Sequence, residues 1–208
     1  MSKKTLIAVP SHEMVHARFT EALMNLEKPA GTGFAMVTNT LIYTARNLIA
    51  QNAVNAGFDQ VLWIDSDMVF DRHLYEDLKM CGRDMVCGLF VSRHFPFCSC
   101  LFKSLIPVER ITEYPDEAFK VAGCGFGCVM MKAQILRDVM ITNKGQCFIP
   151  DPRLGEDVAF CKRATDCGYE IWCEPTARVG HVGSMVIWPE DVERLRGNVH
   201  GLDGMKIE

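Results

Sequence analysis

One short stretch constrains the fold of this chain more than any other. Residues 61–64 read Val-Leu-Trp-Ile, an apolar run typical of a buried central strand, and two carboxylates, Asp65 and Asp67, follow it at once. In open α/β sheets, ligands bind at the carboxyl ends of the strands. We therefore predict an α/β fold organised around this strand, with a binding or catalytic site at its end.

Asp65 and Asp67 allow two kinds of chemistry and one purely structural interpretation. Side chains two residues apart on an extended chain point the same way, so both carboxylates can reach one divalent cation that also carries a diphosphate. Alternatively, one carboxylate attacks a phosphate while the other transfers the proton. In the structural interpretation, the two aspartates only cap a turn.

Length and composition favour one domain and argue against several kinds of partner. The chain has 208 residues, 49% of them hydrophobic, which is enough for one sizeable core. The net charge of -4 arises without long runs of like charge, so long nucleic acid is not an obvious partner. No stretch approaches the ~18 to 20 apolar residues of a membrane span, and we expect a cytoplasmic protein. The ten cysteines form no paired C-x2-C motifs, and we interpret most of them as reduced core thiols.

Before the two aspartates, the chain alternates between strand and helix patterns. We predict a strand over residues 5–9, then a helix capped by Ser11. A second strand over residues 33–38 leads into a helix that ends at Gly57. Alternating units of this kind predict a parallel, doubly wound sheet. The apolar face expected for the second helix consists of Leu41, Ile42, Ala45, Leu48 and Ile49.

Beyond the acidic stretch, the pattern becomes less regular. A short helix over residues 74–81 and a strand over 84–88 are expected. Residues 91–120 are interrupted by three prolines and predict short antiparallel strands and loops of the kind that hold specificity. The glycines of residues 123–127 lack the spacing of a dinucleotide-binding loop. They indicate either a close approach of the backbone to another group or a bulged strand.

Two further signals lie near the end of the chain. Glu156 and Asp157 stand at a predicted helix start, where acids can simply complement the helix dipole. We expect a strand over residues 169–172, a turn at Glu174 and Pro175, and then an apolar run that ends at His181. A lone histidine is more often structural than ligating.

Taken in order, these segments resemble the GT-A-fold glycosyltransferases, in particular small single-domain members similar to those carried in phage genomes. The resemblance runs from about residue 6 to about residue 183, and the cysteine-rich middle matches only loosely. It implies an α/β GT-A fold with a mainly parallel central sheet and a small antiparallel part. It also implies one domain over 1–208, with a nucleotide-binding half of about 1–90 and an acceptor and sugar half of about 91–208. The matching segments are 8–11, 45–47, 62–67, 155–157 and 180–181.

The resemblance implies a nucleotide-sugar donor, UDP-linked, and a divalent cation. Asp67 together with Asp65 would hold the cation, and His181 would be a further ligand supplied from far along the chain. Asp65 could instead bond the ribose hydroxyls. A site of two carboxylates and an imidazole favours Mn²⁺ over Mg²⁺, although such a site can bind either ion.

Matching positions in the family surround the nucleotide. Pro10, Ser11 and Arg46 would frame the base and ribose, and Ser66 belongs to the same donor site. Arg93 is a further candidate for contact with the diphosphate or the sugar, although an arginine at such a position is more often an ordinary surface residue.

The same resemblance assigns the chemistry to Asp157, the second acid of the pair at the helix start. Asp157 would take the proton of the acceptor hydroxyl while the sugar is transferred with inversion. Glu156 would hold an acceptor or sugar hydroxyl, and Gly125 would lie against the substrate. Trp188 would stack on a sugar or acceptor ring, or would only anchor the C-terminal segment to the core.

Two other functions remain open at this stage. Residues 64–69 also fit the D-x-D signature of haloacid-dehalogenase-like phosphohydrolases, in which Asp65 would be the nucleophile and Asp67 the acid and base. A non-catalytic nucleotide-sugar binder is the second alternative. The acceptor of a transferase is not encoded in any motif of the chain, and a glycan, a protein or a modified nucleobase in DNA are all compatible with it.

Overall fold

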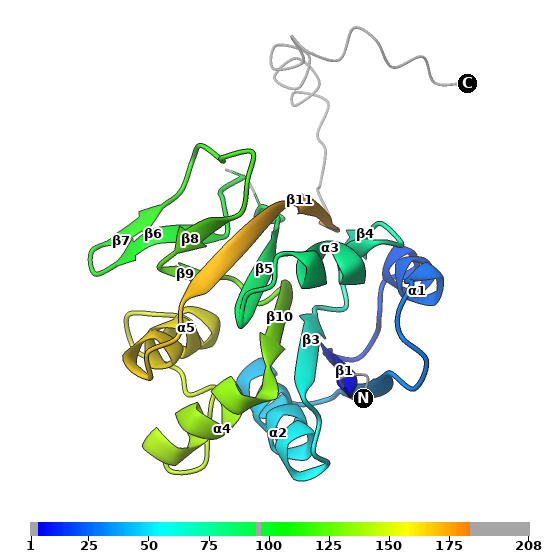
Figure 1. Cartoon of the computed structure of the whole chain (residues 1–208), viewed down its shortest axis with the longest axis horizontal. Coiled ribbons are helices and arrows are strands. Elements are labelled where there is room, and N and C mark those ends of the chain that lie inside the picture. Colours follow the sequence, from blue (N-terminus) through cyan, green and yellow to red (C-terminus); the bar gives the residue numbers. More distant parts are fainter. Residues whose placement is uncertain (1–3, 95–96, 184–208) are drawn as a thin grey trace, which may run out of the picture.

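The main sheet of the protein has eight strands in the order β2-β1-β3-β10-β5-β11-β4, with β8 paired to β11 beside this path (Figure 1). The computed structural model describes residues 4–94 and 97–183. The strands of this sheet are β1 (Thr5–Pro10), β2 (Gly33–Val37), β3 (Gln60–Ile64), β4 (Met68–Phe70), β5 (Met85–Leu89), β8 (Phe119–Val121), β10 (Cys128–Lys132) and β11 (Ile171–His181). A smaller antiparallel sheet contains β6 (Leu101–Leu105), β7 (Val108–Arg110) and β9 (Gly123–Cys124). The helices are α1 (Ala17–Asn25), α2 (Ile42–Asn55), α3 (Leu74–Met80), α4 (Ala133–Thr142) and α5 (Glu156–Asp166).

The strand directions confirm the predicted fold class. Strand β1 is parallel to both β2 and β3, as the first two strand-helix units predict. Strand β10 lies antiparallel between β3 and β5, and β11 is parallel to β5. The central strands thus run in one direction apart from β10, and the small antiparallel sheet comes from the proline-interrupted region.

Two cores lie on opposite faces of the main sheet because the side chains of its strands alternate. In β3, Val61 and Trp63 join the core under α2, α4 and α5, whereas Leu62 and Ile64 join the core under α1 and α3. All four of these side chains are fully buried. Each such burial stabilises the fold by about 1.5–3 kcal/mol. Strand β3 is therefore fixed from both faces, and so is the position of the residues that follow it.

The first helix begins later than the sequence predicted. Helix α1 starts at Ala17, and the side chain of His16 caps it by accepting a hydrogen bond from the backbone N–H of Arg18 at 3.2 Å. Ser11 is not a cap. Its backbone N–H donates to the carbonyl of Val37 at 3.0 Å, so Ser11 stays beside the ends of β1 and β2.

The buried face of α2 also differs from the predicted one. Leu48 is half exposed, and Leu41 and Ile42 are exposed as well. The buried stripe consists of Ala45, Arg46, Ile49, Ala50 and Ala53. An arginine thus replaces an apolar residue on the face that packs against the sheet, because carboxylates from other elements meet it there.

The turn predicted at Glu174 and Pro175 is not a turn. Strand β11 continues through both residues, with a register shift between Glu174 and Arg178. Thr176 donates from its backbone and its hydroxyl to the Glu174 carboxylate, at 3.2 and 2.7 Å. This irregularity lets one strand pair first with β5 and then with β4, so its last residue, His181, reaches the neighbourhood of Met68.

The glycines of residues 123–127 allow close approach of the protein to itself. A Cβ on Gly127 would lie 1.9 Å from the Met68 side chain and 2.9 Å from Phe90. The segment is no single bulged strand, because β9 belongs to the small sheet and β10 to the large one. The glycines let the chain cross between the two sheets through a tightly packed core.

Among residues 4–94 and 97–183, no helix combines the length and the apolar character that crossing a membrane requires.

Candidate active site

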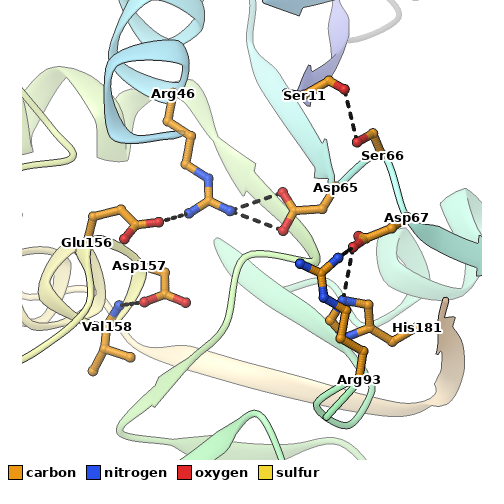
Figure 2. A network of polar contacts seen from close by, with 10 residues as sticks. All are labelled: Ser11, Arg46, Asp65, Ser66, Asp67, Arg93, Glu156, Asp157, Val158 and His181. Carbon is orange, nitrogen blue, oxygen red and sulfur yellow. Dashed lines mark hydrogen bonds and ion pairs between the residues drawn. The ribbon is translucent and has the colours of Figure 1, made fainter. Parts of the chain in front are cut away.

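The acids that follow β3 lie in a tight turn at the carboxyl end of the strand. The backbone N–H of Asp65 donates to the carbonyl of Gly127 at 3.1 Å, and that of Met68 donates to the carbonyl of Asp65 at 3.2 Å. Figure 2 shows the two carboxylates turned to different partners, Asp65 toward Arg46 and Asp67 toward Arg93 and His181. The turn therefore divides the two acids between two clusters.

The first cluster is a buried bridge around Arg46 (Figure 2). Its Nη2 donates to both oxygens of Asp65, at 3.0 and 3.2 Å, and its Nη1 donates to Oε1 of Glu156 at 2.6 Å. The Arg46 side chain is only 4% exposed, and its guanidinium lies 5.3 Å from the ring centre of Phe126 and 5.9 Å from that of Phe148. The bridge therefore joins α2, the end of β3 and the start of α5.

Burial and charge act against each other on the pKa values of the bridge. Burial raises the pKa of the Asp65 carboxyl, and the positive charge of Arg46 only partly opposes this. Burial alone would lower the pKa of Arg46, but the charges of Asp65 and Glu156 outweigh it and raise that pKa. The guanidinium therefore remains charged.

A neighbouring asparagine fixes the loop that leads to α5. The Asn47 side-chain oxygen accepts from the backbone N–H groups of Cys147 and Phe148, each at 2.9 Å, and its nitrogen donates to the carbonyl of Phe148 at 2.8 Å. Asn47 thereby holds the Phe148 ring against the guanidinium of Arg46. Asn47 had no predicted role, although two adjacent polar residues in the middle of a helix are a signal of such a contact.

The second cluster joins Asp67 to the end of β11. Oδ2 of Asp67 lies 3.3 Å from Nε2 of His181 and also contacts the guanidinium of Arg93. The other ring nitrogen of His181, Nδ1, lies 3.0 Å from the carbonyl oxygen of Val91. A carbonyl can only accept, so Nδ1 carries a hydrogen, and in the neutral ring Nε2 presents its lone pair toward Asp67.

The Asp67 and His181 side chains shift each other's pKa. The hydrogen bond to Asp67 raises the pKa of His181, although burial opposes this. Burial alone would raise the pKa of Asp67, but the hydrogen bond and charge of His181, together with the charge of Arg93, lower it. The pair therefore favours a charged carboxylate beside a protonated imidazole when no other cation competes.

Helix α5 places the remaining acids at its N-terminus. Glu156 faces Arg46, as described, and Oδ1 of Asp157 accepts from the backbone N–H of Val158 at 2.7 Å. Asp157 follows Glu156, which Arg46 binds, and its negative charge contributes to the raised pKa of both Arg46 and Asp65.

The residues predicted to surround the nucleotide lie at the ends of neighbouring strands. Pro10 is the last residue of β1, and the hydroxyl of Ser11 lies 3.1 Å from that of Ser66. Gly125 is buried, and a Cβ there would meet the side chains of Phe90 and Cys100. Trp188 lies outside the residues that the structure describes.

The donor set of the second cluster fits a divalent cation. An imidazole nitrogen and a carboxylate oxygen suit Mn²⁺, and their separation of 3.3 Å is near the roughly 3 Å expected of adjacent ligands with bonds of about 2.1 Å. Asp65 is not part of this pair, because both its oxygens are bonded to Arg46. Within residues 4–94 and 97–183, no three side chains of His, Cys, Asp or Glu are grouped as a metal site. The pair leaves the remaining positions of an ion to water or to substrate oxygens.

Comparison with solved structures shows that the chain has the GT-A fold. It is similar to GalNAc-T7, solved with UDP, GalNAc and Mn²⁺, with a TM-score of 0.57 and 10% identity, over 90% of this chain and 44% of that one. It is also similar to A197 from STIV, with a TM-score of 0.52 and 18% identity, over 89% of this chain and 97% of that one. The chain thus spans less than half the length of GalNAc-T7. By sequence, no protein family and no curated protein matches the chain.

Proposed function

We propose that this protein is a metal-dependent glycosyltransferase that moves a sugar from a UDP-linked donor to an acceptor hydroxyl, with inversion at the anomeric carbon. One observation carries the proposal. A carboxylate and imidazole pair, Asp67 with His181, lies just after the carboxyl end of β3, and Arg46 links the start of α5, where Asp157 stands, to the same strand end. A cation site and a base on the edge of a GT-A sheet are what this reaction needs.

Asp67 and His181 would hold Mn²⁺ or Mg²⁺. Such an ion, when bound, offsets the negative charge that builds on a departing nucleoside diphosphate. The presence of UDP and Mn²⁺ in the GalNAc-T7 structure supports this choice of donor and metal.

Pro10, Ser11 and Ser66 would contact the base and ribose from the ends of β1 and β3. The Arg93 side chain is 45% exposed, so it can turn from Asp67 toward the donor diphosphate. Guanidinium groups recognise phosphate oxygens through two parallel hydrogen bonds, which suits Arg93 for this contact.

Asp157 would act as the general base. One of its oxygens accepts the Val158 backbone N–H, and the other remains able to take the proton of the acceptor hydroxyl. Glu156, fixed by Arg46, would help to shape the acceptor or sugar site beside it.

The phosphohydrolase interpretation finds less support in this geometry. It requires Asp65 to attack phosphorus, yet both oxygens of Asp65 accept hydrogen bonds from the buried Arg46. An oxygen bonded to a guanidinium is a weak nucleophile, because its lone pairs are engaged.

The test begins with a panel of nucleotide sugars screened by thermal shift with Mn²⁺ present, because a ligand of the native state raises its stability. Release of nucleoside diphosphate from the best donor is then measured with and without excess chelator, which also separates an enzyme from a non-catalytic binder. We expect activity to be lost in chelator and in Asp67→Ala, and to persist in the control Asp166→Ala, whose exposed side chain pairs with Lys162 of the same helix. Full activity in excess chelator would contradict the proposal.

A further inference from the structure

We infer that Arg46 is a positioning residue, which holds the start of α5, and with it Asp157, at a fixed place relative to the end of β3. Its importance for catalysis rests on the proposed function, but the bridge itself can be tested without any substrate.

The bridge connects elements that are far apart in the sequence. Arg46 contacts Asp65 across 19 positions and Glu156 across 110. Its two terminal nitrogens are engaged by different carboxylates, which only a forked side chain can do at once. A lysine presents a single nitrogen and cannot reproduce both contacts with the same geometry.

The described surroundings of Arg46 enclose its guanidinium inside the protein. The side chain is almost fully buried, and its guanidinium lies over the rings of Phe126 and Phe148. Its remaining donor, Nε, is buried and has no hydrogen-bond partner among the described residues. The resemblance to glycosyltransferases led us to expect Arg46 beside the base and ribose, whereas the geometry points to a role inside the protein.

This role divides the acids of the site into two kinds. Asp65 and Glu156 are occupied by Arg46, so they serve as anchor points of the bridge. Asp67 and Asp157 are left to face the cation and the acceptor. A displacement of about 1 Å between reacting groups can cost on the order of 100-fold in rate, so a fixed separation between these two acids matters for catalysis.

The experiment compares Arg46→Lys with Glu156→Ala, which removes one anchor point, and with the control Arg137→Lys. Arg137 lies on α4 and contacts Gln134 on its own helix. Amide hydrogen exchange of residues 156–160 is measured first, because local opening reports how firmly the helix start is held. Mn²⁺ affinity by isothermal titration and, where a donor has been found, kcat and KM complete the comparison.

We expect exchange at residues 156–160 to become at least about fivefold faster in Arg46→Lys and in Glu156→Ala, and to stay unchanged in Arg137→Lys. Mn²⁺ affinity should weaken by no more than about threefold, because Asp67 and His181 are untouched. The kcat should fall by at least about 30-fold while KM for the donor stays within about threefold, as expected when only the base is misplaced.

Three results would overturn the inference. Unchanged exchange in both bridge variants would show that Arg46 does not hold α5. A loss of about tenfold or more in Mn²⁺ affinity on Arg46→Lys would place Asp65 in the cation site. A raised KM with an unchanged kcat would make Arg46 a donor contact. If the wild-type protein transfers no sugar at all, the proposed function fails, but the exchange and titration results still decide the bridge. Should Arg46→Lys fail to fold, Glu156→Ala carries the same measurements.

Discussion

The two arginines at the site bind neighbouring acids in opposite surroundings. Arg46 pairs with Asp65 and Glu156 inside the protein, and only 4% of its side chain is exposed. Arg93 pairs with Asp67 at the surface, with 45% of its side chain exposed. Arg46 therefore holds elements of the fold together, whereas Arg93 can leave Asp67 and bind a ligand.

This contrast has an energetic reason. Removing one partner of a buried charge pair leaves the other charge unpaired and away from water. When one partner of an exposed pair is removed, water hydrates the remaining charge. The Arg46 side of the site is therefore expected to be rigid, and the side with Arg93 and His181 is expected to adapt to a cation and a diphosphate.

The largest effect should appear when both arginines are replaced by methionine in separate variants. We expect Arg46→Met to lower the free energy of unfolding by about 3–5 kcal/mol, and Arg93→Met to change it by less than about 1 kcal/mol. Urea unfolding of the two variants and the wild type measures both values. Equal losses in the two variants would remove the distinction between the two clusters.

The next largest effect concerns the base on the rigid side. Asp157→Asn keeps the size of the side chain and its place at the start of α5 but cannot accept a proton. We expect transfer to slow by about 100-fold or more while donor binding is retained. The rate constant for transfer and the donor dissociation constant are measured in parallel, and a variant that transfers at the normal rate would place the base elsewhere.

A smaller effect is expected on the adaptable side. His181→Ala should weaken Mn²⁺ binding by roughly tenfold or more, because one of the two proposed ligands is lost. The protein should remain folded. Isothermal titration of Mn²⁺ is performed with nucleoside diphosphate present, and His73→Ala serves as the control because His73 lies on the surface beside Glu27. Equal affinities in His181→Ala and the wild type would remove His181 from the site.

The smallest effect is the pH dependence of the same cluster in the presence of chelator. The pKa of His181 is raised from 6.5, so its stabilisation is complete below that pH and is lost as the pH rises through the raised value. The pKa of Asp67 is lowered from 3.8, so its contribution is complete above that pH and is lost as the pH falls through the lowered value. The difference in unfolding free energy between wild type and His181→Ala should therefore be largest at about pH 4–6.5, and at most about 1 kcal/mol. A difference that grows above pH 8 would contradict this assignment.

The sequence by itself determined much of the first half of the fold. The apolar run of residues 61–64 predicted β3, which spans Gln60–Ile64, and Gly57 ends the preceding helix with a positive φ of 65°. These predictions succeed because short-range patterns decide which residues can be buried on both faces of a strand, and which residue can adopt a left-handed conformation. By contrast, the helix Ala133–Thr142 was not predicted.

The sequence also named the charged residues and the histidine that meet in the two clusters, but only the tertiary structure decided how they pair. Nothing local to Arg46 indicates that it is buried, because its partners come from residues 19 and 110 positions away. Likewise, His181 meets Asp67 only because β11 continues past an irregularity and then pairs with β4. Local preference fixes where a strand ends and which acids follow it, whereas the partner of each charge depends on which distant elements the packing of the two cores brings together.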